Sequence, residues 1–236
     1  MKHYLNLGFI IILGGCWQDS PPESTRYFPL QAGWQWDYQI HTDLINEQYS
    51  RPLSIQTVAP YTFRDQHYAV RRTSEGTDYY LKVEANGIYR YAKRMIVENQ
   101  PQLDTPAQMV LPTPEHAKVG QTWSNLSVPY TLHRISPNPE PPSSQGYRFN
   151  MTYTLLSLQE TVQVPAGEFK DCWLVEGQAQ LYVFADARLG YRDIAITTRE
   201  WYAPSIGLVK LERSEPLDGE VFKGGRITME LTAYKH

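Results

Sequence analysis

The feature that most constrains the fold is a strict alternation of apolar and polar residues near the end of the chain. In residues 225–234, one face would carry Ile227, Met229, Leu231 and Ala233, and the other Thr228, Glu230, Thr232 and Tyr234. Side chains of a β-strand point to opposite faces in turn, so a period of two indicates a strand with one buried face. Strands with one solvated face are typical of antiparallel sheets.

Similar runs recur along most of the chain. In residues 33–40, one face of the predicted strand would carry Trp34, Trp36, Tyr38 and Ile40. Further strands are predicted at residues 51–59, 67–73, 77–84, 87–94, 150–164, 170–184, 194–202 and 207–214. The chain also contains 17 Pro, 17 Tyr, 7 Phe and 6 Trp. Because proline breaks helices and aromatic residues favour strands, the composition agrees with an all-β, or mainly β, fold.

Turn residues separate the predicted strands. Asn86-Gly87 suits a tight hairpin, and Val164-Pro165-Ala166-Gly167 places Pro and Gly as a type I turn requires. Two stretches rich in proline, residues 98–116 and 136–146, are predicted to be long irregular loops, the second with polyproline character. Within the first stretch, we expect at most one short turn, at residues 104–111.

The beginning of the chain has the pattern of an export signal. Met1-Lys2-His3 gives a positively charged start, and an apolar run follows from Leu5 to Leu13. A helix that spans a bilayer needs about 20 apolar residues, so this run is too short to be a transmembrane anchor. It ends in Leu13-Gly14-Gly15-Cys16, which resembles the lipobox of bacterial lipoproteins: a leucine, two small residues and a cysteine.

The lipobox resemblance implies that the signal is cut between Gly15 and Cys16 and that Cys16 carries lipid. In that family the thiol receives a diacylglycerol and the new amino terminus is usually acylated with a fatty acid such as palmitate. The alternative is an ordinary secretory signal with a cysteine at its boundary by chance. In Gram-negative lipoproteins, aspartate after the cysteine favours the inner membrane. Trp17 stands there, so for a Gram-negative source the resemblance implies the outer membrane, facing the periplasm.

We therefore divide the chain into a signal peptide at residues 1–15, a lipidated cysteine with a flexible tether at residues 16–26, and one β domain at residues 27–236. The G-x-x-W runs beginning at Gly33 and Gly120 leave open whether this domain has two similar halves.

The chain has 22 basic and 25 acidic residues, and loss of Lys2 with the signal gives a net charge of 21 − 25 = −4. No basic stripe is present, which argues against a nucleic-acid partner.

The common catalytic and metal-binding motifs are not found in the sequence. No histidine stands at metal-ligand spacing from another histidine or a cysteine, for the set His3, His41, His67, His116, His133 and His236. Asp186 and Asp193 bracket a segment with two arginines, so we expect a solvated, ion-paired loop there rather than a calcium site. For Cys172, a buried apolar role is favoured over a reactive thiol. We expect no enzyme activity, no cofactor and no metal.

Four segments together resemble a group of bacterial envelope lipoproteins sometimes called TapB-like: Tyr27–Tyr38, Val119–Trp123, Val162–Cys172 and Trp201–Lys210. Members look like curved antiparallel sheets, distantly similar to the half-barrels of the LolA and LolB lipoprotein carriers. The resemblance implies a half-barrel in the cell envelope and no particular activity. From the residues alone, we expect Phe169, Trp173 and Trp201 to be core aromatics and Gly207 to form a turn or bulge.

Three functional hypotheses follow. The first is a non-enzymatic envelope protein that binds a partner or assists assembly. The second is a lipid- or lipoprotein-binding half-barrel, in which a concave sheet lined with aromatic residues holds acyl chains. The sequence predicts no helix that could act as a lid over the bound lipid in this second hypothesis. The third is an enzyme of unrecognised type. Under the first two, the partners are the membrane, through lipid on Cys16, and either an envelope protein or a lipid ligand.

Overall fold

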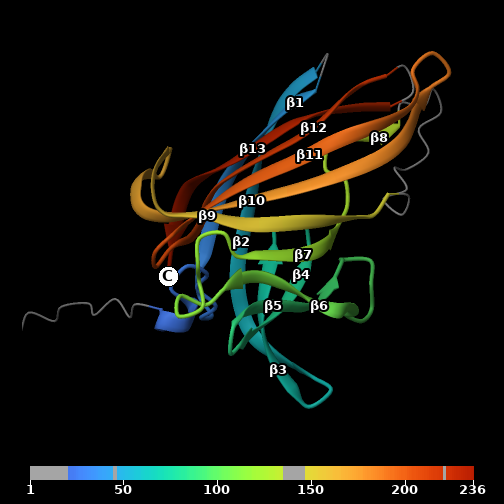
Figure 1. Ribbon diagram of the computed structural model, residues 1–236. Coiled ribbons are helices and arrows are strands. Elements are labelled where there is room, and N and C mark those ends of the chain that lie inside the picture. Colours follow the sequence, from blue (N-terminus) through green and yellow to red (C-terminus); the bar gives the residue numbers. More distant parts are fainter. Residues whose placement is uncertain (1–20, 45–46, 135–146, 220–221) are drawn as a thin grey trace, which may run out of the picture.

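The computed structural model describes residues 21–44, 47–134, 147–219 and 222–236. These residues form one antiparallel sheet of thirteen strands (Figure 1). The strands are β1 (Gln35–Leu44), β2 (Glu47–Phe63), β3 (Gln66–Thr73), β4 (Asp78–Glu84), β5 (Gly87–Arg94), β6 (Gln102–Pro112), β7 (Thr122–Ser127), β8 (His133–Arg134), β9 (Phe149–Val164), β10 (Gly167–Asp186), β11 (Gly190–Ala203), β12 (Gly207–Asp218) and β13 (Phe222–Lys235). Along the sheet the order is β6-β5-β4-β3-β2-β1-β13-β12-β11-β10-β9-β7, with β8 paired to β13. The predicted all-β fold is confirmed.

The sheet curves until its two edge strands approach each other. β6 and β7 stand at opposite ends of the strand order, yet they lie side by side (Figure 1). The Nδ2 atom of Asn125 on β7 donates a hydrogen bond to the carbonyl oxygen of Met109 on β6 at 2.7 Å. No strand pairing joins β6 to β7 in the described part of the chain. The sheet is therefore a nearly closed half-barrel, which confirms the predicted curvature.

Antiparallel connections give the half-barrel two distinct ends. The first described residues, the β9–β10 turn and the C-terminus lie at one end, which we call the near end (Figure 1). The β1–β2, β5–β6 and β10–β11 connections lie at the opposite, far end. The described residues include one 3-10 turn, η1 (Glu23–Thr25), which lies within the predicted tether and buries Thr25. None of their helical segments is long and apolar enough to cross a membrane.

The stretch at residues 98–116 corrects the sequence prediction. It contains strand β6 rather than an irregular loop with a short turn at residues 104–111. β6 is an edge strand, and edge strands tolerate proline because one side of their backbone pairs with no neighbour. Pro106 lies where the register between β5 and β6 shifts, so the sheet there lacks a regular ladder to interrupt. The second predicted loop, residues 136–146, lies outside the described residues.

Among the described residues, four apolar clusters form the core, with members from Tyr27 to Leu231. Tyr27 helps to cover the near end, because its ring stacks on Trp173 with the centroids 3.9 Å apart. Its hydroxyl donates to the carbonyl oxygen of Asp171 at 3.2 Å. The predicted core role of Trp173 is confirmed, since 4 % of it is exposed.

Arg71 fastens the residues that follow Tyr27. Its guanidinium carbon lies 3.5 Å from the ring centroid of Phe28 and 4.4 Å from that of Trp36. Its Nη2 atom donates to the carbonyl oxygen of Pro29 at 2.7 Å. Burial lowers the pKa of Arg71 to about 10. The aromatic and proline residues at the start of the body are thus explained by packing around one buried cation.

We expect Arg71→Ala to lower the free energy of unfolding by about 3 kcal/mol, because it removes a buried charged hydrogen bond and leaves a cavity between two rings. Urea unfolding of the body from Pro21 measures the change. Arg226→Ala removes an equal charge at an exposed position and should cost less than about 0.5 kcal/mol. If the two variants unfolded alike, Arg71 would not hold the near end.

Candidate functional site

A row of inward-facing residues crosses the middle of the half-barrel. The strand register places next to one another Trp123, Tyr153, Gly177, Thr198 and Arg213. A Cβ atom at Gly177 would lie 2.6 Å from Cγ2 of Thr198 and 3.0 Å from Cε1 of Tyr153. Only glycine therefore lets the Tyr153 ring lie over strand β10 at this point.

Six polar and aromatic side chains gather around this row, and we call them the central polar cluster: Tyr79, Arg90, Tyr130, Tyr153, Glu200 and Arg213. They come, in this order, from β4, β5, the loop after β7, β9, β11 and β12. Tyr153 interacts electrostatically with Glu200, Tyr130, Arg213 and Arg90, so the cluster joins opposite walls of the half-barrel. Four of its members are partly exposed.

The cluster lies between two apolar parts of the core. One contains Leu155 and Val175, and the other contains Met151 and Ile196. In each case the two residues come from β9 and from β10 or β11, the strands that carry Tyr153 and its neighbours. The middle of the half-barrel is therefore polar, whereas the interior on both sides of it is apolar.

Glu200 is a carboxylate held inside the half-barrel. It accepts a hydrogen bond from the hydroxyl of Tyr202 at 2.5 Å. Burial raises the pKa of Glu200, and the bond from Tyr202 and the charge of Arg213 offset part of that rise. Glu200 therefore takes up a proton more readily than an exposed glutamate does, and it can act as either acceptor or donor towards a polar group.

Arg213 and Glu215 form a buried ion pair that holds the loop after β7. The Nε atom of Arg213 donates to Oε1 of Glu215 at 2.7 Å, and these side chains are 2 % and 0 % exposed. Glu215 also accepts hydrogen bonds from the backbone N–H groups of Tyr130, Thr131 and Leu132, at 2.7 to 3.0 Å. Burial would raise the pKa of Glu215, but Arg213 and these N–H groups outweigh it and lower the pKa.

This ion pair places Tyr130 in the cluster. The guanidinium carbon of Arg213 lies 3.9 Å from the Tyr130 ring centroid, and its Nη2 donates to the carbonyl oxygen of Val128 at 2.9 Å. On the opposite wall, Arg90 donates to both carboxylate oxygens of Asp104, at 2.6 and 3.1 Å. Both cations are thus fixed by carboxylates, while Glu200 faces the cluster without an ion pair among the described residues.

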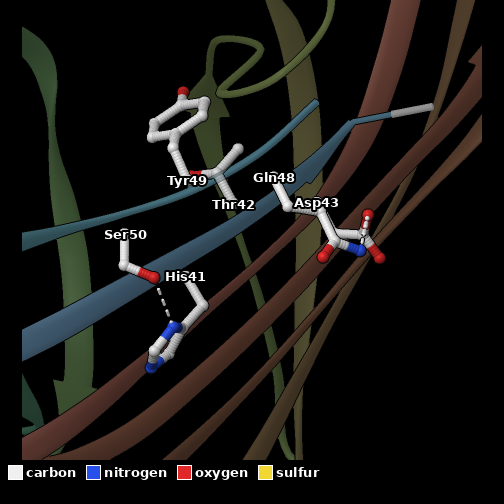
Figure 2. A pocket seen from close by; sticks show the side chains of 6 residues that line it. All are labelled: His41, Thr42, Asp43, Gln48, Tyr49 and Ser50. Atoms are coloured by element: carbon white, nitrogen blue, oxygen red, sulfur yellow. Dashed lines mark hydrogen bonds between the residues drawn. The ribbon is translucent and has the colours of Figure 1, made fainter. Parts of the chain in front are cut away.

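A separate shallow depression of about 380 Å³ lies on the β1–β2 hairpin at the far end (Figure 2). Nδ1 of His41 and Oγ of Ser50 are 2.7 Å apart, and Gln48 donates to Asp43 at 3.0 Å. These are cross-strand pairs on solvent-exposed side chains. Because these polar groups bond their neighbours across the ribbon, the described residues of the depression present no convergent set of groups.

The structure places the residues predicted from the sequence as follows. Gly15 and Cys16 lie outside the described residues. Cys172 is fully buried in β10, and burial raises the pKa of its thiol to about 11, which agrees with a packing role. In the predicted solvated loop, Asp193 is exposed as expected, whereas Asp186 is 1 % exposed and accepts hydrogen bonds from the N–H groups of Arg188 and Leu189. The described residues contain no group of three or more potential metal ligands.

The central polar cluster is not among the predicted sites. Its members are far apart in sequence, and only the sheet register and the β6–β7 approach bring them together. One feature of the sequence could have pointed to Glu200. Ile194 and Ile196 fix the inward phase of β11, and the same phase continues through Thr198 to Glu200. A polar residue in the buried phase of a strand needs a partner inside the protein.

The fold is an antiparallel half-barrel with a polar centre, and comparison with known proteins adds little to this. No protein-family model matches the chain, and no curated protein does. One similar solved structure is that of a protein from Bacteroides fragilis, which is described as an exported protein with a YmcC-like fold. It is 15 % identical, with TM-score 0.38, covering 87 % of this chain and 97 % of that chain. Another, named as a lipoprotein, is from Parabacteroides distasonis (14 % identity, TM-score 0.41, 92 % and 100 % coverage). The TapB-like resemblance stays a prediction.

Proposed function

We propose that this chain is a lipid-anchored, non-enzymatic protein of the cell envelope, and that its half-barrel is a binding or assembly module. The lipobox ending in Cys16 supports the anchor, and its context supports the periplasmic face of an outer membrane. The observation that carries the binding role is the central polar cluster. It places Glu200, a carboxylate that forms no ion pair with the described residues, among partly exposed tyrosines inside a curved sheet.

Buried polar atoms near the cluster agree with a polar ligand or peptide segment. The Nε1 atom of Trp123 and the Oγ1 atom of Thr198 have no hydrogen-bond partner within the described chain. Leaving such atoms unpaired costs roughly 1–3 kcal/mol each. A partner that reaches this region would gain that energy as well as the stacking surface of Tyr153.

A lipid-binding half-barrel is the second candidate, and one observation favours it. Apolar residues line the interior on both sides of the cluster, among them Leu155 and Ile196. Against it, an acyl chain running along the interior would cross Glu200 and Arg213. Charged groups resist contact with hydrocarbon, so this arrangement supports a polar ligand better than an acyl chain.

The proposal predicts that Glu200→Gln weakens the binding of any species that co-purifies with the lipidated protein, by tenfold or more, since a charge-assisted hydrogen bond contributes roughly 1.5–3 kcal/mol. Native mass spectrometry of protein purified gently from envelopes measures the bound fraction. Arg199→Gln is the matched control, because Arg199 is the adjacent residue of β11 and points to the opposite, exposed face. Equal retention by both variants, or a bare mass for the unmodified protein in every preparation, would refute a ligand at this site.

A further inference from the structure

Arg71 is a buried cation that forms no ion pair within the part of the chain that the structure describes. Only 8 % of the residue is exposed. Burial lowers its pKa to about 10, so the guanidinium still carries its charge at neutral pH. Charges inside proteins are ordinarily paired, because an isolated charge loses its hydration on burial. The charge of Arg71 therefore needs a partner that its protein neighbours do not supply.

The contacts of Arg71 leave one of its hydrogen-bond donors unused. The rings of Phe28 and Trp36 lie close to the guanidinium carbon, and they attract its charge without accepting an N–H in the plane of the group. The Nη2 atom donates to the carbonyl oxygen of Pro29 at 2.7 Å. The Nε atom is buried and has no hydrogen-bond partner among the described residues. A buried polar group of this kind calls for a bound water or ion.

A second unpartnered group lies beside Arg71. Thr57 is directly across from it in the β2–β3 register, so both side chains are on the same face of the sheet. Thr57 is 3 % exposed, and its Oγ1 atom also has no hydrogen-bond partner within the described chain. The nearby hydroxyls of Tyr38 and Tyr202 are engaged elsewhere, since they donate to a backbone carbonyl at 2.8 Å and to a carboxylate at 2.5 Å. Two buried donors on adjacent strands thus share the need for an acceptor.

We propose that Arg71 and Thr57 bind a small monovalent anion of the size of chloride. The ion accepts hydrogen bonds from Nε of Arg71 and Oγ1 of Thr57, and its charge matches the single unpaired charge of the guanidinium. A buried water could accept the same two bonds, but it would leave that charge uncompensated. A larger anion fits poorly, because both side chains are more than nine-tenths buried. The site does not rest on the proposed function, since neither residue belongs to the central polar cluster.

The anion joins segments that meet at the near end. Arg71 on β3 contacts Phe28 and Pro29, which follow the predicted tether. Thr57 on β2 accepts a hydrogen bond at its carbonyl oxygen from the N–H group of Gly33, just before β1. An ion shared by Arg71 and Thr57 therefore strengthens the attachment of the segment before β1 to the sheet. Because the unfolded chain has no such site, the ion stabilises the folded protein in proportion to its occupancy.

Urea unfolding of the full chain in mild detergent tests the site. Sodium gluconate, whose anion is too large for it, is replaced stepwise by sodium chloride at constant ionic strength. Above the dissociation constant, each tenfold rise in chloride should lower the unfolding equilibrium constant nearly tenfold. Thr57→Val keeps the shape of the side chain but removes the hydroxyl, so it should need at least about tenfold more chloride for the same effect. The control Thr62→Val changes an exposed threonine of the same strand and should respond as the unmodified chain does.

Bromide, which replaces chloride in such sites, locates the ion directly. In crystals of the protein grown in sodium bromide, we expect an anomalous-scattering peak within hydrogen-bond distance of Nε of Arg71 and Oγ1 of Thr57. Three results would overturn this assignment. Stability could be independent of chloride. Thr57→Val could respond to chloride as the unmodified chain does, which would show a general salt effect. The crystals could also show a water without anomalous signal between the two groups.

Discussion

Glu215→Ala should lower the free energy of unfolding by about 3–5 kcal/mol, the largest stability change that we expect from one side chain. The substitution leaves the guanidinium of Arg213 buried without its carboxylate, which is the costly way to break an internal ion pair. It also removes the acceptor of three backbone N–H groups in the loop after β7. Urea unfolding gives the total, and hydrogen exchange at the Thr131 and Leu132 amides gives the local effect.

Two comparisons show whether the pair acts as described. Glu212→Ala changes a partly exposed glutamate on the same strand and should cost less than about 1 kcal/mol. Replacing Arg213 and Glu215 together by Met and Leu should cost less than the sum of the single losses, because no charge is left unpaired. Unchanged exchange at Thr131 in Glu215→Ala would show that the loop is held by something else.

Cys16→Ala should abolish covalent lipid attachment, an all-or-none effect. In a bacterial host that processes lipoproteins, incorporation of labelled palmitate into the chain should fall to background. The thiol of Cys16 is the proposed acceptor, and Cys172 is the only other cysteine. Two or three acyl chains give practically permanent anchoring, at roughly 0.8 kcal/mol for each buried CH₂, whereas one chain binds weakly.

Cys172→Ala serves as the matched control, since it also removes one of the two cysteines. It should retain full incorporation, because the Cys172 side chain is buried in β10 and no modifying enzyme could reach it in the folded body. Label that persists in Cys16→Ala, or is lost equally in both variants, would contradict attachment at Cys16.

Strand positions could be predicted because burial imposes a period of two. Trp36, Tyr38 and Ile40 are buried on β1 in the expected phase, and β9 to β13 match their predicted ranges within a few residues. The prediction was wrong for β6, because its prolines were taken to indicate an irregular loop. Their cost depends on whether a neighbouring strand lies on both sides, and strand order is a property of the whole sheet that local sequence does not encode.

The candidate site was harder to predict than the fold. Glu200 and Arg213 come from adjacent strands, but Tyr79 and Arg90 reach them only because the sheet curves through twelve strands. The role of Glu215 was equally hidden, since its partners lie in a loop more than eighty residues earlier in the chain. Such contacts are long-range, whereas the export signal and the lipobox are local patterns that can be read directly.

The mass of the native product tests the account most directly. Protein extracted in detergent from its own cells should begin at Cys16 and carry the added mass of a diacylglycerol and an amide-linked fatty acid. Intact-protein mass spectrometry, followed by release of the esterified chains with base, resolves both features. A product that retains Met1 to Gly15, or that begins at Cys16 with an unmodified thiol, would contradict a lipid-anchored envelope protein.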